Sequence, residues 1–446
     1  MSPDFDPLAL TQDERLDYRY DGPEAIYTFW AKHGPCQVTG CGHRTPIMSS
    51  NVIAIKSISV KHWQHSCRKC GTEFHVEADD ARMAPDVPLY VAELEFPYSV
   101  LDRRKGVVCP SCGESELVNL GKGVNKKVEL SLLMHPDWLS GSASRDAEGR
   151  PYGGTAQDDA ISTASWDQER ASHIRLLEVR GDLPNEVTCP ETGTVFAAGK
   201  GRGTVPKKAH FTCAACGTVQ SVLDTVKASK KTGAMAGYAI HGYSPARDKA
   251  GAAYNGRFFA PFDERIARQY DVATAEWERR KNADLAGYWP VSEVPYGFMT
   301  ALNNGDIRIG HGYTHWSHMF NPRQLLCLSQ LLKGIMTIGS YANSTREALL
   351  GAFQQSVRYQ NMFCFWDINY DKMVPHMSNN NYHPKANIVE GSCFGVMGSG
   401  RWSACASGVV DGIEWRNAPY DLVSPQHVEQ LCGATDAKQT SVKAYI

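Results

Sequence analysis

The sequence predicts an α+β protein of several domains, with cysteine-rich β modules followed by a mixed α/β region that contains a helical pair. Three observations predict this class. The motif Cys-x-x-Cys-Gly, whose glycine permits the positive-φ turn of a metal-binding knuckle, begins at Cys67, Cys109 and Cys213. β-branched runs at 52–55 and 58–60 predict short strands near the first knuckle. Amphipathic helical patterns follow in the second half of the chain.

Changes in composition divide the chain into four expected units. These are a zinc-ribbon domain at 1–135, a linker or insertion rich in Gly, Ser, Ala and Asp at 136–185, a second ribbon-like basic module at 186–245, and the mixed α/β region at 246–446.

Three helices are expected in the last unit, near 263–285, 321–340 and 345–360. Asn321 followed by Pro322 is a favourable helix start. Ser344-Thr-Arg-Glu347 matches a capping box for the third helix. We therefore expect two antiparallel helices joined by a short loop.

Composition is that of a globular protein, with 42% hydrophobic and 21% charged residues among 446. The formal net charge of −2 gives no general affinity for nucleic acid, so any such contact must come from local patches. The longest apolar stretch, 325–338, is interrupted by polar residues and predicts no membrane span. The acidic N-terminal segment lacks the apolar region of a signal peptide, and we expect a cytoplasmic protein.

The chain contains 14 cysteines. Because Cys-x-x-Cys pairs in a large chain without an export signal are typical of metal sites in a reducing compartment, we interpret them as zinc ligands rather than disulfides. The first four-thiolate set is expected to consist of two pairs that are close in sequence, Cys36, Cys41, Cys67 and Cys70. Four thiolates fill the shell of zinc, so this site should be structural. His43 is an alternative fourth ligand.

The second predicted metal site is less complete. Cys213 and Cys216 are its ordinary ligands, and Cys189 begins a knuckle whose second cysteine is replaced by Thr192. Threonine is a poor zinc ligand, so either this set has lost its metal or a distant residue completes it. Alternatively, Cys109 and Cys112 join Cys213 and Cys216 in a split site.

A competing interpretation comes from His75-Val-Glu77, which Cys109-Pro-Ser-Cys112 follows. Zinc nucleobase deaminases use H-x-E and then P-C-x-x-C, with the glutamate moving protons beside a zinc-bound water. Val108 stands where that pattern has proline, and the motif directly follows a knuckle. A β-strand leaving the knuckle explains it more simply.

A basic segment surrounds the third knuckle and predicts phosphate contacts. The side chains that we expect to contact nucleic acid are Lys200, Arg202, Lys207, Lys208, Lys230 and Lys231. Asn380 and Asn381 lie in a run of asparagines, and asparagine amides can bind adenine edges.

Two strings in the second half are distinctive, 312–326 (GYTHWSHMFNPRQLL) and 379–385 (NNNYHPK), with Val389-Glu390 shortly after. Together with the knuckles, they resemble the zinc-ribbon-containing adenine-specific DNA methyltransferases, some of which accompany bacterial phage-defence islands. The resemblance covers about 27–420. It implies DNA as partner and methyl transfer from S-adenosylmethionine to adenine N6 in a restriction-modification or phage-defence system.

The same resemblance places the chemistry outside this chain. The family carries an S-adenosylmethionine glycine motif before the zinc region and a D-P-P-Y motif after it, and we find neither here. Residues 394–400 are glycine-rich and Asn417-Ala-Pro-Tyr420 is one residue from D-P-P-Y, but the two lie too close together to serve as both motifs. No catalytic residue is therefore assigned, and a second chain or the rest of a longer enzyme is expected to supply the site. A non-enzymatic zinc-ribbon DNA-binding or scaffolding protein is the alternative.

Overall fold

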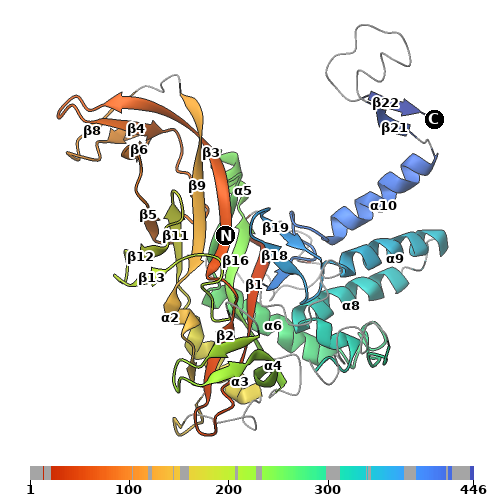
Figure 1. Ribbon diagram of the computed structural model, residues 1–446. Helices are drawn as coiled ribbons and strands as arrows, with labels where there is room; N and C mark the ends of the chain where they lie inside the picture. The colour runs from red at the N-terminus through yellow and green to blue at the C-terminus, as the bar shows by residue number, and fades with distance from the viewer. Residues whose placement is uncertain are drawn as a thin grey trace.

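The computed structural model has an α+β architecture in which two β-sheets pack face to face and the long helices of the second half of the chain lie to one side (Figure 1). It describes residues 14, 22–102, 104–118, 123–143, 145–150, 160–205, 209–227, 234–297, 312–337, 339, 343–375, 388–417, 420–423 and 442–445.

The larger sheet is eight-stranded within the described chain and is centred on β1 (Glu24–Pro35). β1 is buried along nearly its whole length and pairs antiparallel with three strands, which fixes it as the middle of the sheet. The other strands are β2 (His43–Ile47), β10 (Ser142–Ala143), β16 (Ala234–Tyr243), β17 (Arg257–Pro261), β18 (Phe365–Asp367), β19 (Lys372–Val374) and β20 (Ile388–Gly391).

The second sheet is six-stranded and is built around two long strands, β3 (Val52–Ser66) and β9 (Val124–Met134). These strands pair antiparallel from Val52 to His62 of β3. The remaining strands are β4 (Glu73–Glu77), β5 (Leu89–Val91), β6 (Tyr98–Val100) and β11 (Leu176–Arg180). The far ends of β3 and β9, with β4 and β6, extend away from the rest of the molecule (Figure 1).

Small two-stranded hairpins complete the described β structure. They are β7–β8 (Val107–Val108 and Ser115–Glu116), β12–β13 (Glu186–Thr188 and Val195–Ala197), β14–β15 (His210–Thr212 and Val219–Ser221) and β21–β22 (Tyr420–Val423 and Val442–Tyr445). The first three hairpins each have a cysteine knuckle as their turn, as expected for a motif that reverses the chain over a positive-φ glycine.

The described helices are α2 (Pro136–Leu139), α3 (Ala160–Ala171), α4 (Val222–Lys227), α5 (Pro245–Lys249), α6 (Glu264–Arg280), the 3₁₀ turn η4 (Trp316–Met319), α8 (Pro322–Thr337), α9 (Asn343–Val357) and α10 (Trp402–Asn417). The three expected helices correspond to α6, α8 and α9. Asn321 caps α8 as predicted, since its side chain accepts a 2.8 Å bond from the Gln324 amide. α9 begins at Asn343, so Ser344 is already helical.

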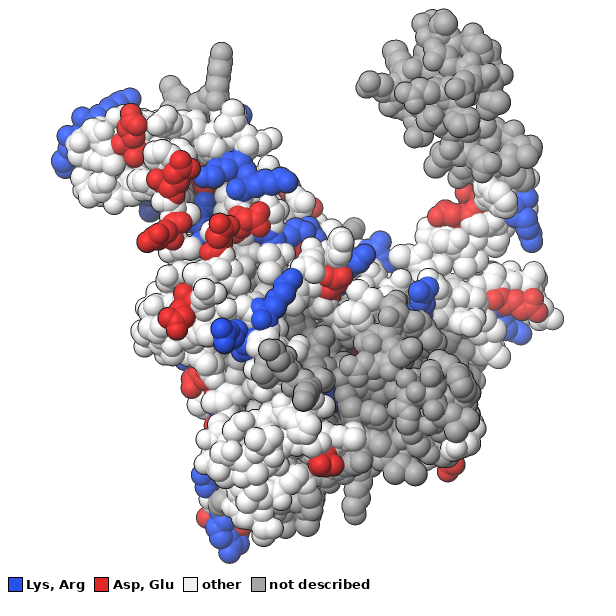
Figure 2. Space-filling view, in the orientation of Figure 1, with Lys and Arg blue, Asp and Glu red and all other residues white. Residues whose placement is uncertain are grey.

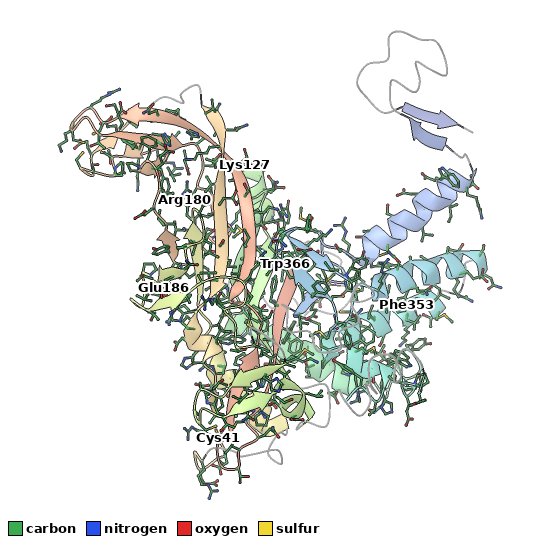
Figure 3. All side chains as sticks on the ribbon, in the orientation of Figure 1. Cys41, Lys127, Arg180, Glu186, Phe353 and Trp366 are labelled. Carbon is green, nitrogen blue, oxygen red and sulfur yellow. The ribbon has the colours of Figure 1, made fainter. Side chains whose placement is uncertain are left out.

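The main core lies between the two sheets. Aromatic side chains of the larger sheet, among them Phe29, Tyr238 and Trp366, meet aliphatic side chains of β3 and β9 such as Leu130 and Leu132. Figure 3 shows Trp366 at the centre of this body. The expected unit boundaries do not separate the sheets, because strands from all four units contribute to them. In particular, the expected linker at 136–185 supplies β10, β11 and α3 to the folded body.

No helix among these residues is both long and apolar enough to cross a membrane.

Candidate metal centres

Cys36, Cys41, Cys213 and Cys216 lie together, and we call them the proximal centre. The first pair follows β1, where the Cys36 amide donates a 2.7 Å bond to the His43 carbonyl. The second pair forms the turn of β14–β15, closed by a 3.0 Å bond from the Cys213 amide to the Thr218 carbonyl. The centre therefore joins the end of the central strand to a hairpin from the middle of the chain.

Cys67, Cys70, Cys109 and Cys112 form a second group, which we call the distal centre. Cys67 and Cys70 lie in the turn between β3 and β4, and Cys109 and Cys112 in the turn of β7–β8. Each knuckle is closed by the same pair of backbone bonds, for example 2.9 Å from the Gly71 amide to the Cys67 carbonyl. This centre holds two neighbouring turns together at the far end of β3.

The spacing of the sulfur atoms fits a tetrahedral ion. In the proximal centre the Sγ atoms of Cys36 and Cys216 are 3.7 Å apart, and those of Cys41 and Cys213 are 3.8 Å apart. In the distal centre two such distances are 3.7 Å. A zinc–sulfur bond of about 2.3 Å gives a tetrahedron whose edges are about 3.8 Å. Both groups could therefore hold a metal ion, and the donor set suits zinc.

One thiol in each centre is favoured as the thiolate that metal binding requires. The Thr72 hydroxyl lies 3.2 Å from Cys70 Sγ, and bonds from the side chain and backbone of Thr72 lower the pKa of Cys70 to about 6. Thr218 acts in the same way on Cys216, whose pKa is also lowered to about 6. Burial instead raises the pKa of Cys36, so that thiol depends on a bound cation for ionisation.

The predicted grouping of Cys36 and Cys41 with Cys67 and Cys70 is wrong, and so is the alternative pairing of Cys109 and Cys112 with Cys213 and Cys216. The cause is the length of β3. Its 15 residues lead from the body to the distal turn, a contour length of about 50 Å at 3.3 Å per residue. The intervening segment is thus a long strand rather than the compact hairpins that the ribbon hypothesis assumed. His43 is also not a ligand, since its Nε2 lies 2.8 Å from the Ser140 carbonyl oxygen.

Cys189 forms a knuckle without a metal group in the described chain. Its backbone matches the others, with bonds of 2.9 Å from the Cys189 amide to Thr194 and 2.8 Å from the Gly193 amide to Cys189. Thr192 occupies the place of the second cysteine and hydrogen-bonds His135 Nε2 at 3.2 Å. Thr192 therefore makes a hydrogen bond at the position where a second cysteine would bind a metal. No group of possible metal ligands among the described residues includes Cys189, so the prediction that Cys189 is a ligand is not confirmed.

The deaminase interpretation does not fit. Four thiolates occupy all the ligand positions of the distal centre, which leaves no place for an activated water or for His75. Glu77 is 3% exposed and forms an ion pair with Arg180, so its carboxylate is already engaged.

Most of the residues that we expected to contact nucleic acid lie outside the described part of the chain, namely Lys207, Lys208, Lys230, Lys231, Asn380 and Asn381. Lys200 and Arg202 are described and exposed. Lys200 Nζ donates a 2.8 Å bond to Asn369 Oδ1.

Sequence reasoning missed other charged groups. Arg323 forms a two-pronged ion pair with Glu390, at 2.8 Å for both contacts, and Trp30 Nε1 donates to the same carboxylate at 3.0 Å. This pair joins α8 to the larger sheet. Lys126 and Lys127 are exposed on β9, where exposed Lys127 and Glu129 alternate with buried Val128 and Leu130. That period-2 pattern was a readable signal of a half-buried strand.

Comparison of the chain with protein-family models, curated proteins and solved structures finds no match. The two four-thiolate groups are therefore the chemistry from which a function must be argued.

Proposed function

We propose that this chain is the zinc-organised, DNA-contacting part of an adenine-specific DNA methyltransferase of a modification or phage-defence system. The observation that carries the proposal is the pair of complete four-thiolate groups, each with tetrahedral sulfur spacing. A filled ligand shell leaves no open position for substrate or water, so zinc here would hold the fold and not perform chemistry. Each centre would act as a small ribbon-like module within the body.

The methyltransferase part of the proposal depends on the resemblance of 312–326 and 379–385 to that family. The first string forms the loop, η4 and the start of α8, and Arg323 within it pairs with Glu390. The second string lies outside the described residues. These residues would fix the helical side of the body against the larger sheet. S-adenosylmethionine would supply the methyl group at a site outside this chain, and the target adenine would have to leave the duplex to reach it.

The test begins with the purified, reduced 446-residue chain. We expect two zinc ions per chain by elemental analysis, one for each four-thiolate group, and salt-dependent binding to duplex DNA. Calorimetry should detect no tight binding of S-adenosylmethionine to the chain alone. Co-expression with the reading frames next to its own should yield methylation of adenine N6.

Each outcome has a definite meaning. Protein without zinc would contradict the metal centres, and tight S-adenosylmethionine binding by the isolated chain would contradict a cofactor site elsewhere. DNA binding without any methylation on co-expression would favour the non-enzymatic DNA-binding or scaffolding alternative. Absence of DNA binding would reject both functions.

A further inference from the structure

The outer part of the second sheet forms an arm, which we define as residues 60–77, 98–102, 104–118 and 123–128 (Figure 1). The main core ends at its base, where Val60 and Val128 are the last buried side chains of β3 and β9 in that core. Beyond them the arm buries a small cluster of its own, Cys67, Phe74, Val76, Val107 and Cys109. So small a cluster is marginal without a metal, so the distal centre would hold the arm in shape.

Cationic side chains are concentrated on this arm. Its described residues include seven lysines and arginines, Lys61, Arg68, Lys69, Arg104, Lys105, Lys126 and Lys127, against five acids, Glu73, Glu77, Asp102, Glu114 and Glu116. The chain as a whole has a net charge of −2. Figure 2 shows blue side chains at the end of the arm with red ones between them, and Figure 3 shows Lys127 high on β9, at the opposite end of the molecule from Cys41.

Most acids of the arm are paired, either within the arm or with Arg180 of β11. Glu77 pairs with Arg180, and Glu116 accepts a 3.0 Å bond from His65 and another from the Arg68 amide. Asp102 accepts the amides of two residues in its own turn. The carboxylates are therefore occupied by local structure.

Several cations have no such partner. Lys61, Lys126 and Lys127 are exposed, and no carboxylate in the described chain lies within ion-pair distance of them. In the register of β3 and β9, Lys127 is opposite Ser59 and Lys61 is opposite Asn125. Lys61 and Lys127 are thus diagonal neighbours on one face, roughly 7–8 Å apart between backbones. Like charges at this spacing repel unless an anion lies between them.

The opposite face has a cation beside aromatic rings. Lys126 is opposite Val60, which places it diagonal to His62 on the same face. His62 and His75 have ring centroids 4.9 Å apart, and Phe96, which is 40% exposed, follows at 5.1 Å from His75. The aliphatic part of the Lys61 side chain passes close to Gly123, just before β9. A Cβ atom at position 123 would lie only 2.8 Å from Lys61 Cγ, so glycine leaves room for this side chain. Lysines therefore lie on both faces of the sheet in the arm.

The turns at the end of the arm carry four more cations, two of which are ion-paired. Arg68 and Lys69 lie between the two cysteines of the first knuckle, with side chains 78% and 63% exposed, and they pair with Glu116 at 4.0 Å and with Glu114 at 2.6 Å. Arg104 and Lys105 are exposed in the turn that leads to the second knuckle. Metal binding would hold all four at fixed positions.

We infer that this arm binds the phosphate backbone of duplex DNA, with Lys61, Lys126 and Lys127 as the central contacts. The inference rests on the proposed function, because it names the surface through which the chain contacts its DNA. Lysine ammonium groups bind phosphate oxygens without regard to base sequence, so exposed lysines of β3 and β9 that have no carboxylate partner among the described residues suit contacts with the DNA backbone. This surface is separate from the basic segment at 200–231, which the sequence favoured.

The experiment compares two matched triple variants of the full chain by their DNA affinity at several salt concentrations. The arm variant is Lys61→Gln, Lys126→Gln and Lys127→Gln. The control changes three exposed arginines of α6, Arg265→Gln, Arg268→Gln and Arg279→Gln, and so removes the same charge. Affinity falls as salt rises, so the slope of log affinity against log salt is negative. We expect the arm variant to make this slope shallower by about 3, since each phosphate contact contributes about 1 to its magnitude. The control should change the slope by less than about 1.

A third variant with Lys→Arg at the three arm positions should keep the wild-type slope, and every variant should retain its zinc. Equal slopes for the arm and α6 variants, with wild-type binding intact, would overturn the arm inference and leave the proposed function standing. No salt-dependent binding by the wild type would instead reject the proposed function. Tighter binding to duplex RNA than to DNA of the same sequence, through the same lysines, would also overturn the inference.

Discussion

The proximal and distal centres each have four cysteine ligands, but the segments that they join are separated by very different numbers of residues. The sulfur pairs of the proximal centre link residues 172 and 180 positions apart, whereas those of the distal centre link residues 39 and 45 positions apart. The proximal centre adjoins β1, the middle of the main sheet, and the distal centre lies at the end of an arm with a small core. Identical coordination chemistry should therefore have a global effect in one place and a local effect in the other.

The largest effect is expected from Cys36→Ser. Loss of one proximal ligand should remove one of two zinc ions and release the β14–β15 hairpin from the end of β1. Because closing so long a loop couples distant parts of the chain, we expect the free energy of unfolding of the whole body to fall by about 4–5 kcal/mol or more. Thermal unfolding and zinc analysis would measure this, with Cys405→Ser, outside both centres, as control. Unchanged zinc content would contradict the proximal centre.

Cys109→Ser should destabilise the arm while leaving the body folded. We expect loss of the other zinc ion and of hydrogen-exchange protection over β4 and the β7–β8 hairpin, because the remaining cluster is too small to hold them. Protection of β1 and β16 should persist, since their core does not involve this centre. Hydrogen exchange read by mass spectrometry distinguishes the two regions. Simultaneous loss of protection in the body would remove the distinction between local and global centres.

Acid should destabilise the body through protonation of His241, which lies in the body and not in the arm. His241 is buried in β16 beside Tyr254, and its surroundings include Asp371, Arg257 and Lys56. Burial lowers its pKa from 6.5 to about 4. Between these values the unfolded chain binds the proton and the folded chain does not, so stability is fully present above pH 6.5 and falls as pH drops towards 4.

A shift of this size corresponds to about 3 kcal/mol of stability lost on acidification. His241→Gln should flatten the dependence of the urea midpoint on pH in this window, whereas His210→Gln, at an exposed position, should not. Equal slopes for wild type and His241→Gln would show that this histidine does not couple pH to the body.

Local features were largely readable from the sequence. The knuckles are turns over positive-φ glycines, as the Cys-x-x-Cys-Gly spacing predicts, and Asn321 caps α8. Such features depend on a few consecutive residues, so their energetics are contained in the motif. The boundaries of the expected units were not readable, because β11 and α3 come from a segment whose Gly and Ser content indicated a linker.

The main error of the sequence analysis was its prediction of which cysteine pairs share a metal site. The sequence offered three knuckles and one looser pair, and proximity along the chain favoured Cys36 and Cys41 with Cys67 and Cys70. The two predicted strands are parts of one 15-residue strand. The sequence did not indicate this, because the polar residues Lys56 and Ser57 between them suggested that one strand ends and another begins. The arm lysines were overlooked for a related reason, because only strand register brings Lys61 beside Lys127.

By itself, then, the sequence determined which residues can bind metal, where the knuckles turn and where α6 and α8 begin, because each of these depends on neighbours a few positions away. Only the tertiary structure decided which thiol pairs share an ion and which lysines share a surface. Those choices follow from the direction and length of β3 and from the pairing of β1 with strands distant in the chain, and no short window of residues contains either.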